Sequence, residues 1–160
     1  PAFSYGINIY LEYKNFDLTM FWQGVQGVDI ISDLKKETDL WSGLNIGFLN
    51  KGKRVLDAWS PANPGSDIPA LARNDSNNEK RVSTYYVENG SFLKLRNLQV
   101  GYNIPKAWTE KIRMERLRFY LSAQNLLTIK SKDFTGVDPE NVNYGYPIPL
   151  NITFGVNVSF

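Results

Sequence analysis

The sequence contains no histidine and no cysteine. Their absence excludes disulfide bridges, zinc sites built from thiolates or imidazoles, cysteine nucleophiles and every catalytic triad with a histidine base. No apolar run approaches the roughly 18 residues that a membrane-spanning helix requires. The 18 Lys and Arg residues nearly balance the 16 Asp and Glu residues and are scattered along the chain. That scatter argues against a nucleic-acid-binding surface.

What the 160 residues do contain is an aromatic content of 14%, joined to a mean hydropathy of only −0.33. Coiled coils and disordered tails do not have this composition. The chain opens Pro-Ala-Phe, without an initiator Met or a visible signal peptide. We therefore expect it to be a piece of a longer protein.

Five segments alternate apolar and polar residues with a period of two, which predicts β-strands that each have one apolar face. The expected strands span about 4–14, 16–25, 91–103, 115–127 and 150–160. The last segment is the clearest, because five apolar residues alternate there with five polar or small ones. The apolar five are Ile152, Phe154, Val156, Val158 and Phe160.

The third expected strand changes phase near Arg96-Asn97. Its apolar residues occupy odd positions up to Leu95 and even positions from Leu98 onward. A β-bulge there would restore a single apolar face, and this is the interpretation that we favour. The alternative is a straight strand whose Lys94 and Arg96 face lipid headgroups at the outer rim.

The connections between these strands are alternately short and long. The first and third are Lys14-Asn15 and about 104–113, whereas the second and fourth are loops of about 27–90 and 128–149. Outer-membrane barrels have such tight periplasmic turns and extended extracellular loops. The sequence thus predicts an all-β fold, part of a transmembrane antiparallel β-barrel with long extracellular loops. The alternative is a soluble antiparallel sheet that buries the same apolar face in an ordinary core.

In a barrel, the apolar side chains face lipid and the polar ones face a wet lumen. The expected lipid-facing residues are Leu117, Phe119, Leu121, Ile152, Phe154, Val156 and Val158. The expected lumen-facing residues are Arg116, Arg118, Gln124, Asn151 and Asn157, with both arginines near the periplasmic mouth. Because five strands cannot close and bare edges are prohibitive in lipid, we expect another segment to pair with each edge strand.

The last eight residues read Thr-Phe-Gly-Val-Asn-Val-Ser-Phe. With Thr153, Gly155, Val158 and Phe160 at fixed spacing, they resemble the terminal-strand signal recognised by the barrel-insertion machinery of Gram-negative outer membranes. Val158 replaces the more usual aromatic residue. The insertion machinery is therefore an expected partner.

Four longer motifs stand out in the sequence. Segment 85–105 reads Tyr-Tyr-Val-Glu-Asn-Gly-Ser-Phe-Leu-Lys-Leu-Arg-Asn-Leu-Gln-Val-Gly-Tyr-Asn-Ile-Pro, and 117–127 reads Leu-Arg-Phe-Tyr-Leu-Ser-Ala-Gln-Asn-Leu-Leu. The other two are Phe-Thr-Gly-Val-Asp-Pro-Glu at 134–140 and Trp-Ser-Pro-Ala-Asn-Pro at 59–64. These motifs resemble signatures of the SusC/RagA family of TonB-linked outer-membrane transporters, arrive in the family's order and cover nearly the whole chain.

The resemblance implies the last five strands of a 22-stranded barrel, whose N-terminal plug lies outside these residues. It implies an importer of oligosaccharides or oligopeptides with a SusD-like surface lipoprotein as lid, energised by a TonB complex through the missing N-terminal part. The expected location is multi-pass in the outer membrane of a Gram-negative, Bacteroidetes-type bacterium. Outer-membrane lipid and the rest of the barrel are the other expected neighbours. The segment is expected to belong to a transporter and not to an enzyme. We therefore expect no catalytic residue, no metal site and no cofactor in it, and no nucleic acid as a partner.

The two long loops are the expected contact surfaces for cargo or lid. The candidate residues are Trp59, Asp138, Glu140, Tyr144 and Tyr146. The carboxylates of Asp138 and Glu140 would suit a cation site or an acid–base pair. In the alternative, Asp138-Pro139 starts a turn and Glu140 is solvated.

Loop 27–90 also has apolar residues at helical spacing, which predicts an amphipathic helix. These residues are Phe48, Leu49, Val55, Leu56 and Trp59. They either pack the loop onto itself or contact cargo.

Two other functions stay open. A siderophore or vitamin receptor shares the barrel but usually lacks the Val-Glu-Asn-Gly-Ser-Phe and Asp-Pro-Glu signatures. A soluble β-sandwich module would bind glycans through its aromatic residues. Co-purification of a lipoprotein lid separates the importer from the receptor, and dependence on detergent separates both from the soluble module.

Overall fold

A computed structural model describes residues 1–40, 50–72, 75, 78–142 and 146–160. The chain forms two compact units. The sheet unit comprises Pro1–Val28, Ser91–Ser131 and Ile148–Phe160, and the loop unit comprises Asp29–Gly90 and Lys132–Pro147.

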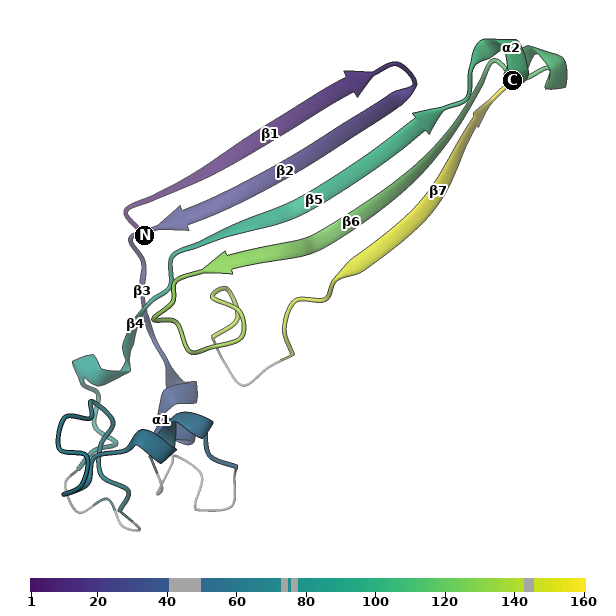
Figure 1. Cartoon of the computed structure of the whole chain (residues 1–160). Coiled ribbons are helices and arrows are strands. Elements are labelled where there is room, and N and C mark those ends of the chain that lie inside the picture. Colours follow the sequence, from purple (N-terminus) through teal and green to yellow (C-terminus); the bar gives the residue numbers. More distant parts are fainter. Residues whose placement is uncertain (41–49, 73–74, 76–77, 143–145) are drawn as a thin grey trace. The chain divides into compact units, whose positions relative to one another are not determined.

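The sheet unit is one antiparallel sheet of five strands in the order β1-β2-β5-β6-β7 (Figure 1). Its strands are β1 (Phe3–Tyr13), β2 (Phe16–Gln26), β5 (Phe92–Asn103), β6 (Arg116–Lys130) and β7 (Asn151–Ser159). These bounds lie close to the expected ranges, except that β6 runs further, to Lys130. Within the described part of the chain, β1 and β7 are the two edges of this sheet.

The strand register carries the alternation across the whole sheet. One row of paired residues is wholly apolar and runs from β1 to β7 through Leu11, Leu18, Val100, Leu121 and Phe154. The adjacent row is polar and runs through Tyr10, Thr19, Gln99, Ser122 and Thr153. Neighbouring residues on a strand point to opposite faces, so the sheet has one apolar face and one polar face. The apolar row is open: Leu121 is 51% exposed and Phe154 is 67% exposed.

The phase change in β5 is a β-bulge at Arg96, which confirms the interpretation that we favoured. Phe21 of β2 pairs with Asn97, and the next residue, Trp22, pairs with Leu95, so Arg96 is the extra residue. The bulge keeps the apolar residues before and after it on one face. Arg96 donates hydrogen bonds to Gln23 Oε1 at 2.7 Å and to Asn125 Oδ1 at 3.4 Å.

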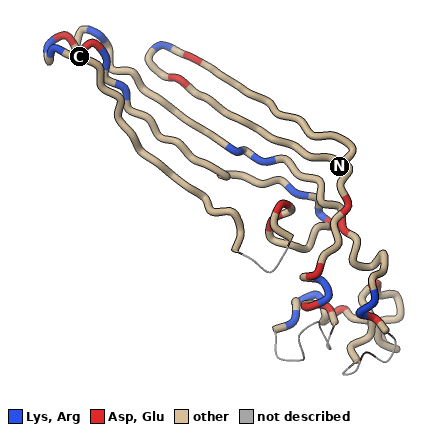
Figure 2. The backbone as a smooth tube through the Cα atoms, turned by 180° about the vertical axis from the view of Figure 1, so that it is seen from behind, with Lys and Arg blue, Asp and Glu red and all other residues tan. Residues whose placement is uncertain are grey.

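The two short connections are built differently. β1 and β2 are joined by Lys14-Asn15, with Lys14 in the left-handed region at φ 54°. The β5–β6 turn holds α2 (Lys106–Thr109) and η3 (Glu110–Ile112), and it is closed by a hydrogen bond from Met114 N to Thr109 O at 3.0 Å. Figure 2 shows charged residues on this turn and in the loop unit, with few along the long strands.

The described residues of the loop unit form short elements only. β3 (Asp29–Ile31) pairs antiparallel with β4 (Val87–Asn89), and the helices are α1 (Asp33–Asp39), η1 (Lys53–Asp57) and η2 (Thr84–Tyr86). Ser32 caps α1, because its Oγ accepts a hydrogen bond from Lys35 N at 3.3 Å. The most buried apolar side chains in this unit are Leu40, Ile68, Tyr86 and Phe134. None of the helices in the described ranges has the length and apolarity to cross a membrane.

The prediction of an amphipathic helix in loop 27–90 is wrong about its length, because the helix found there is short. Val55 and Leu56 lie in η1, a 3₁₀ helix that ends at Asp57, and Trp59 lies beyond its extended C-cap. Leu56 is 79% exposed, so the segment lacks the buried apolar stripe that would stabilise a longer helix. Phe48 and Leu49 lie outside the described residues.

Candidate functional site

A buried ion pair crosses the polar face of the sheet. Arg118 of β6 donates from Nε to Asp17 Oδ2 of β2 at 2.9 Å, and Nη2 binds Oδ1 of the same carboxylate. Asp17 is 7% exposed and Arg118 is 9% exposed. β5 lies between these two strands, and the pair spans it above Gly101, where an added Cβ would overlap both side chains.

The second predicted lumen arginine joins the same network. Arg116 donates to Asn103 Oδ1 at 3.0 Å, and Asn103 Nδ2 donates to Asp17 Oδ2 at 3.3 Å. The structure places Arg116 and Arg118 on the polar face of the sheet. That this face lines a lumen stays a prediction. The residues that sequence reasoning missed are their partners, Asp17 and Asn103.

The terminal strand β7 places the expected assembly residues on both faces. Thr153 and Gly155 are on the polar face, beside Ser122 and Tyr120 of β6, and Val158 is on the apolar face beside Leu117. The Tyr120 ring occupies the space that a Cβ at Gly155 would fill. Gly155 thus leaves room for this ring, which a side chain at 155 would displace. Phe160, at 83% exposed, extends past the strand.

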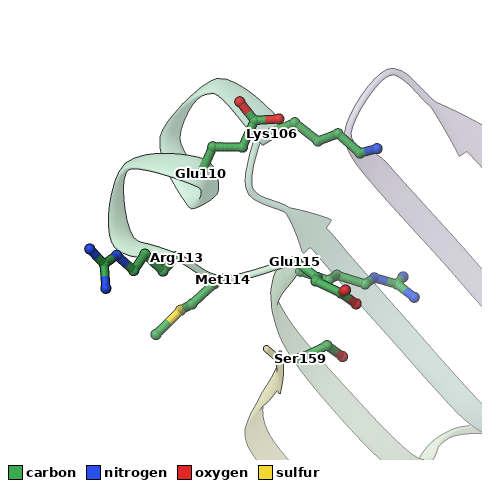
Figure 3. Close-up of a pocket in the computed structure, with 7 residues that line it drawn as sticks. Lys106, Glu110, Arg113, Met114, Glu115 and Ser159 are labelled. Atoms are coloured by element: carbon green, nitrogen blue, oxygen red, sulfur yellow. The ribbon is translucent and has the colours of Figure 1, made fainter.

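An open cavity of about 630 Å³ lies at the β5–β6 turn (Figure 3). Its lining combines Lys106, Arg113 and Arg116 with the carboxylates of Glu110 and Glu115. Beside it, Trp108 is 69% exposed and Ile112 is 53% exposed.

In the loop unit, two buried carboxylates organise a cluster of polar side chains. Asp39, which is fully buried, accepts hydrogen bonds from Tyr85 Oη at 2.7 Å and from Thr38 Oγ1 at 3.3 Å. Glu88, 4% exposed, accepts from both the backbone N and the Oγ1 of Thr135, at 3.0 and 2.7 Å. The contacts of Tyr85 with Asp39 and of Thr135 with Glu88 join segments that lie more than forty residues apart in the sequence.

Two cations lie against these carboxylates. Arg54 Nη1 is 3.5 Å from Asp39 Oδ2, and Lys35 Nζ is 3.9 Å from Glu88 Oε1. Burial lowers the pKa of Lys35, and the charge of Arg54 lowers it further, against the opposite effects of Glu88 and Asp39. Burial and the hydrogen bond to Asp39 raise the pKa of Tyr85 well above its ordinary value. No periodic pattern in the sequence predicts this cluster.

Comparison with known proteins relates the chain to one group. The chain is 36% identical over its whole length to TonB-dependent receptor P3 of Formosa agariphila, and 27% identical over 97% of its length to TonB-dependent receptor SusC of Bacteroides thetaiotaomicron. The RagAB peptide importer in its closed-closed state matches 98% of the chain with a TM-score of 0.79 and 29% identity. The chain belongs to the SusC/RagA family.

This SusC/RagA segment spans about one-sixth of the relatives' length: 16% of receptor P3, 15% of SusC and 17% of the RagAB chain. No family model matches it. The five-stranded sheet is accordingly part of an antiparallel β-barrel of this family.

The described members of the predicted loop residues each make local contacts of their own. Trp59 is 44% exposed and pairs its backbone N with Ile68 O at 2.8 Å. Tyr146 is 96% exposed, and its carbonyl accepts from Asn141 Nδ2 at 2.8 Å. Tyr144 lies outside the described residues.

Asp138 and Glu140 support the turn alternative. Asp138 Oδ1 accepts a hydrogen bond from Glu140 N at 2.9 Å, and Asn141 N donates to Asp138 O at 3.0 Å. Asp138 is 7% exposed, whereas Glu140 is exposed. Among the described residues, no group of three His, Cys, Asp or Glu side chains is placed to hold a metal ion.

Proposed function

We propose that the full-length protein is a SusC-like, TonB-dependent importer of the outer membrane and that this chain forms part of its barrel wall. The observation that carries the proposal is the pair of opposite rows, one apolar and one polar, that run unbroken across five strands. A sheet with these two faces suits a wall between lipid and water, because lipid requires closed backbone pairing and an apolar exterior.

The proposal assigns each face of the wall. The apolar residues Leu117, Phe119, Leu121, Ile152, Phe154, Val156 and Val158 contact lipid. The polar residues Arg116, Arg118, Gln124, Asn151 and Asn157 face the lumen. The short turns are then periplasmic, and loops 27–90 and 128–149 are extracellular.

The proposed partners follow from family membership. A SusD-like lipoprotein closes over the loops, a TonB complex acts through other parts of the protein, and the insertion machinery reads Thr153, Gly155, Val158 and Phe160. The likeness to the RagAB peptide importer makes oligopeptides the first cargo to test, beside oligosaccharides. Trp59, Asp138, Glu140, Tyr144 and Tyr146 remain candidate loop contacts for cargo or lid.

Extraction of the full-length protein from its native membrane tests this function. We expect recovery only with detergent, in complex with a surface lipoprotein, and native mass spectrometry should show bound oligopeptide or oligosaccharide. Deletion of the protein should abolish uptake of that cargo. Recovery from the soluble fraction would contradict the barrel, and a detergent-dependent protein that carries a siderophore or vitamin without a lipoprotein would contradict the importer.

A further inference from the structure

A second cavity, of about 540 Å³, lies wholly within the loop unit. Its wall includes Lys35 from α1, Arg54 from η1 and Tyr85 from η2, and Lys132, Asp67 and Asp133 also line it. Three cations and two carboxylates therefore surround one polar opening. The side chains come from five separate stretches of the loop unit, which is typical of a preformed site.

Two further carboxylates, those of Asp39 and Glu88, contact residues of this wall and already accept hydrogen bonds. Both oxygens of Asp39 accept hydrogen bonds, from Thr38 and Tyr85, and both oxygens of Glu88 accept hydrogen bonds from Thr135. Arg54 Nη1 lies 3.5 Å from Asp39 but makes no hydrogen bond, although this nitrogen is buried. The charge of Asp39 therefore attracts the guanidinium, but Arg54 Nη1 donates no hydrogen bond to it.

The only tyrosine on this wall does not offer a stacking surface. Lys35 Nζ lies 4.1 Å from the centroid of the Tyr85 ring, and the Tyr86 ring packs against it edge-on with centroids 5.1 Å apart. A neutral sugar recognised by stacking would need an open aromatic face. The wall instead presents charge-assisted donors, which are suited to an oxyanion.

We propose that this cavity is a carboxylate-binding subsite in which Arg54, with Lys35 and Lys132, holds a carboxylate group of the cargo. The inference rests on the proposed importer function and specifies which chemical group the cargo presents to the loop unit. A planar guanidinium binds a carboxylate through two parallel hydrogen bonds. Asp39 and Glu88 already pair with Arg54 and Lys35, and together with Asp67 and Asp133 the four carboxylates outnumber the three cations. The subsite therefore favours a carboxylate on a ligand that also carries hydrogen-bond donors or a positive group.

The carboxylate has three possible sources: the C-terminus of a peptide, an acidic side chain or a uronic acid. The probes are therefore N-acetyl-tetra-alanine with a free C-terminus, the same peptide as its C-terminal amide, a doubly blocked peptide with one central Glu, and digalacturonate. Binding is measured by calorimetry on the full-length protein purified with its native partner chains. The tightest of the three carboxylate probes identifies the source.

The variant Arg54→Gln should weaken the best carboxylate probe about tenfold or more, which corresponds to the loss of one charge-assisted contact. Lys53→Gln is the matched control, because Lys53 is the neighbouring exposed residue of η1 and does not line the cavity. It should bind as the wild type does. Arg54→Lys should recover only part of the lost affinity, since a lysine ammonium keeps the positive charge but lacks the two parallel donors of a guanidinium.

Lys132→Gln guards against a folding artefact, because Lys132 is exposed and its replacement should weaken the same probe about threefold without a loss of stability. The inference is overturned if the amide binds as well as the free acid, or if Arg54→Gln and Lys132→Gln both bind like Lys53→Gln. Uptake and lipoprotein co-purification are measured on the same strains. If the wild-type protein shows neither uptake nor a co-purifying lipoprotein, the importer function is refuted. Normal uptake with no preference for the carboxylate probes would refute the subsite alone.

Discussion

The sheet unit and the loop unit are stabilised by different kinds of interaction. In the sheet unit a local rule, alternation with a period of two, repeats along every long strand, and the register adds the apolar rows together. In the loop unit the structure depends on single polar contacts between distant segments, such as Tyr85 with Asp39 and Thr135 with Glu88. The comparison teaches that the wall tolerates change at many positions, whereas the loop unit depends on a few buried groups.

The ion pair of Asp17 with Arg118 is the exception within the sheet, and its loss should have the largest effect. Replacing Arg118 with Met leaves the buried Asp17 carboxylate without its guanidinium and should lower the free energy of unfolding by about 3–5 kcal/mol. Urea unfolding of the full-length barrel in micelles measures this. Asp17→Leu added to Arg118→Met should restore much of the loss.

The matched control for the ion pair is Arg116→Met. Arg116 is exposed and bonds only to the neutral Asn103 among the described residues, so the cost should be about 1 kcal/mol. Equal losses for the two arginine variants would contradict the claim that the sheet depends on this one buried charge.

A charge on the apolar face should have the next largest effect. Phe154→Lys places an ammonium on the apolar face, near the middle of β7, and the expected cost is about 2–4 kcal/mol if that face contacts the bilayer interior. Thr153→Lys, one residue earlier on the opposite face, should cost much less. Folding of both full-length variants into lipid vesicles compares them, and equal yields would argue against the assignment of faces.

In the loop unit, Tyr85→Phe tests dependence on a single buried contact. The change removes a hydrogen bond to the fully buried Asp39 and should cost about 1–3 kcal/mol. Faster proteolysis of the loop unit, with the barrel itself intact, is the expected sign. Tyr146→Phe is the control, since Tyr146 is 96% exposed and should cleave at the wild-type rate.

The same tyrosine predicts how the loop unit responds to alkali. The pKa of Tyr85 is raised in the folded protein above its ordinary value of 10.0, so the folded state holds this proton more tightly. The resulting stabilisation is complete below pH 10 and is lost as the pH rises towards the folded pKa. The wild type should therefore lose protection from proteolysis above pH 10 more steeply than Tyr85→Phe, and parallel profiles would contradict this.

The smallest effect on the finished barrel should come from deletion of Phe160. Its ring is 83% exposed in the described chain and contributes about 2 kcal/mol of burial at most. As an assembly signal, however, its deletion should lower the surface level of the full-length protein more than it lowers the stability of the protein that does assemble. Surface levels equal to the wild type would rule out that role.

The sequence predicted the sheet because its information is local. The alternation of Ile152 and Phe154 with polar neighbours indicated a strand, and the phase change between Leu95 and Leu98 indicated the bulge. The ion pair was not predictable, because Asp17 and Arg118 are 101 positions apart and only the register brings them together. Likewise, no sequence pattern around Lys35 or Arg54 predicts that residues of α1, η1 and η2 line one cavity.

The central claim is that one face of the sheet contacts lipid and the other contacts water. Single cysteines at positions 151–158, in an otherwise cysteine-free full-length protein, can carry nitroxide labels in lipid vesicles. We expect oxygen to relax the labels at 152, 154, 156 and 158, and a water-soluble nickel chelate to relax those at 151, 153 and 157. Uniform accessibility along β7, or the opposite alternation, would contradict the account.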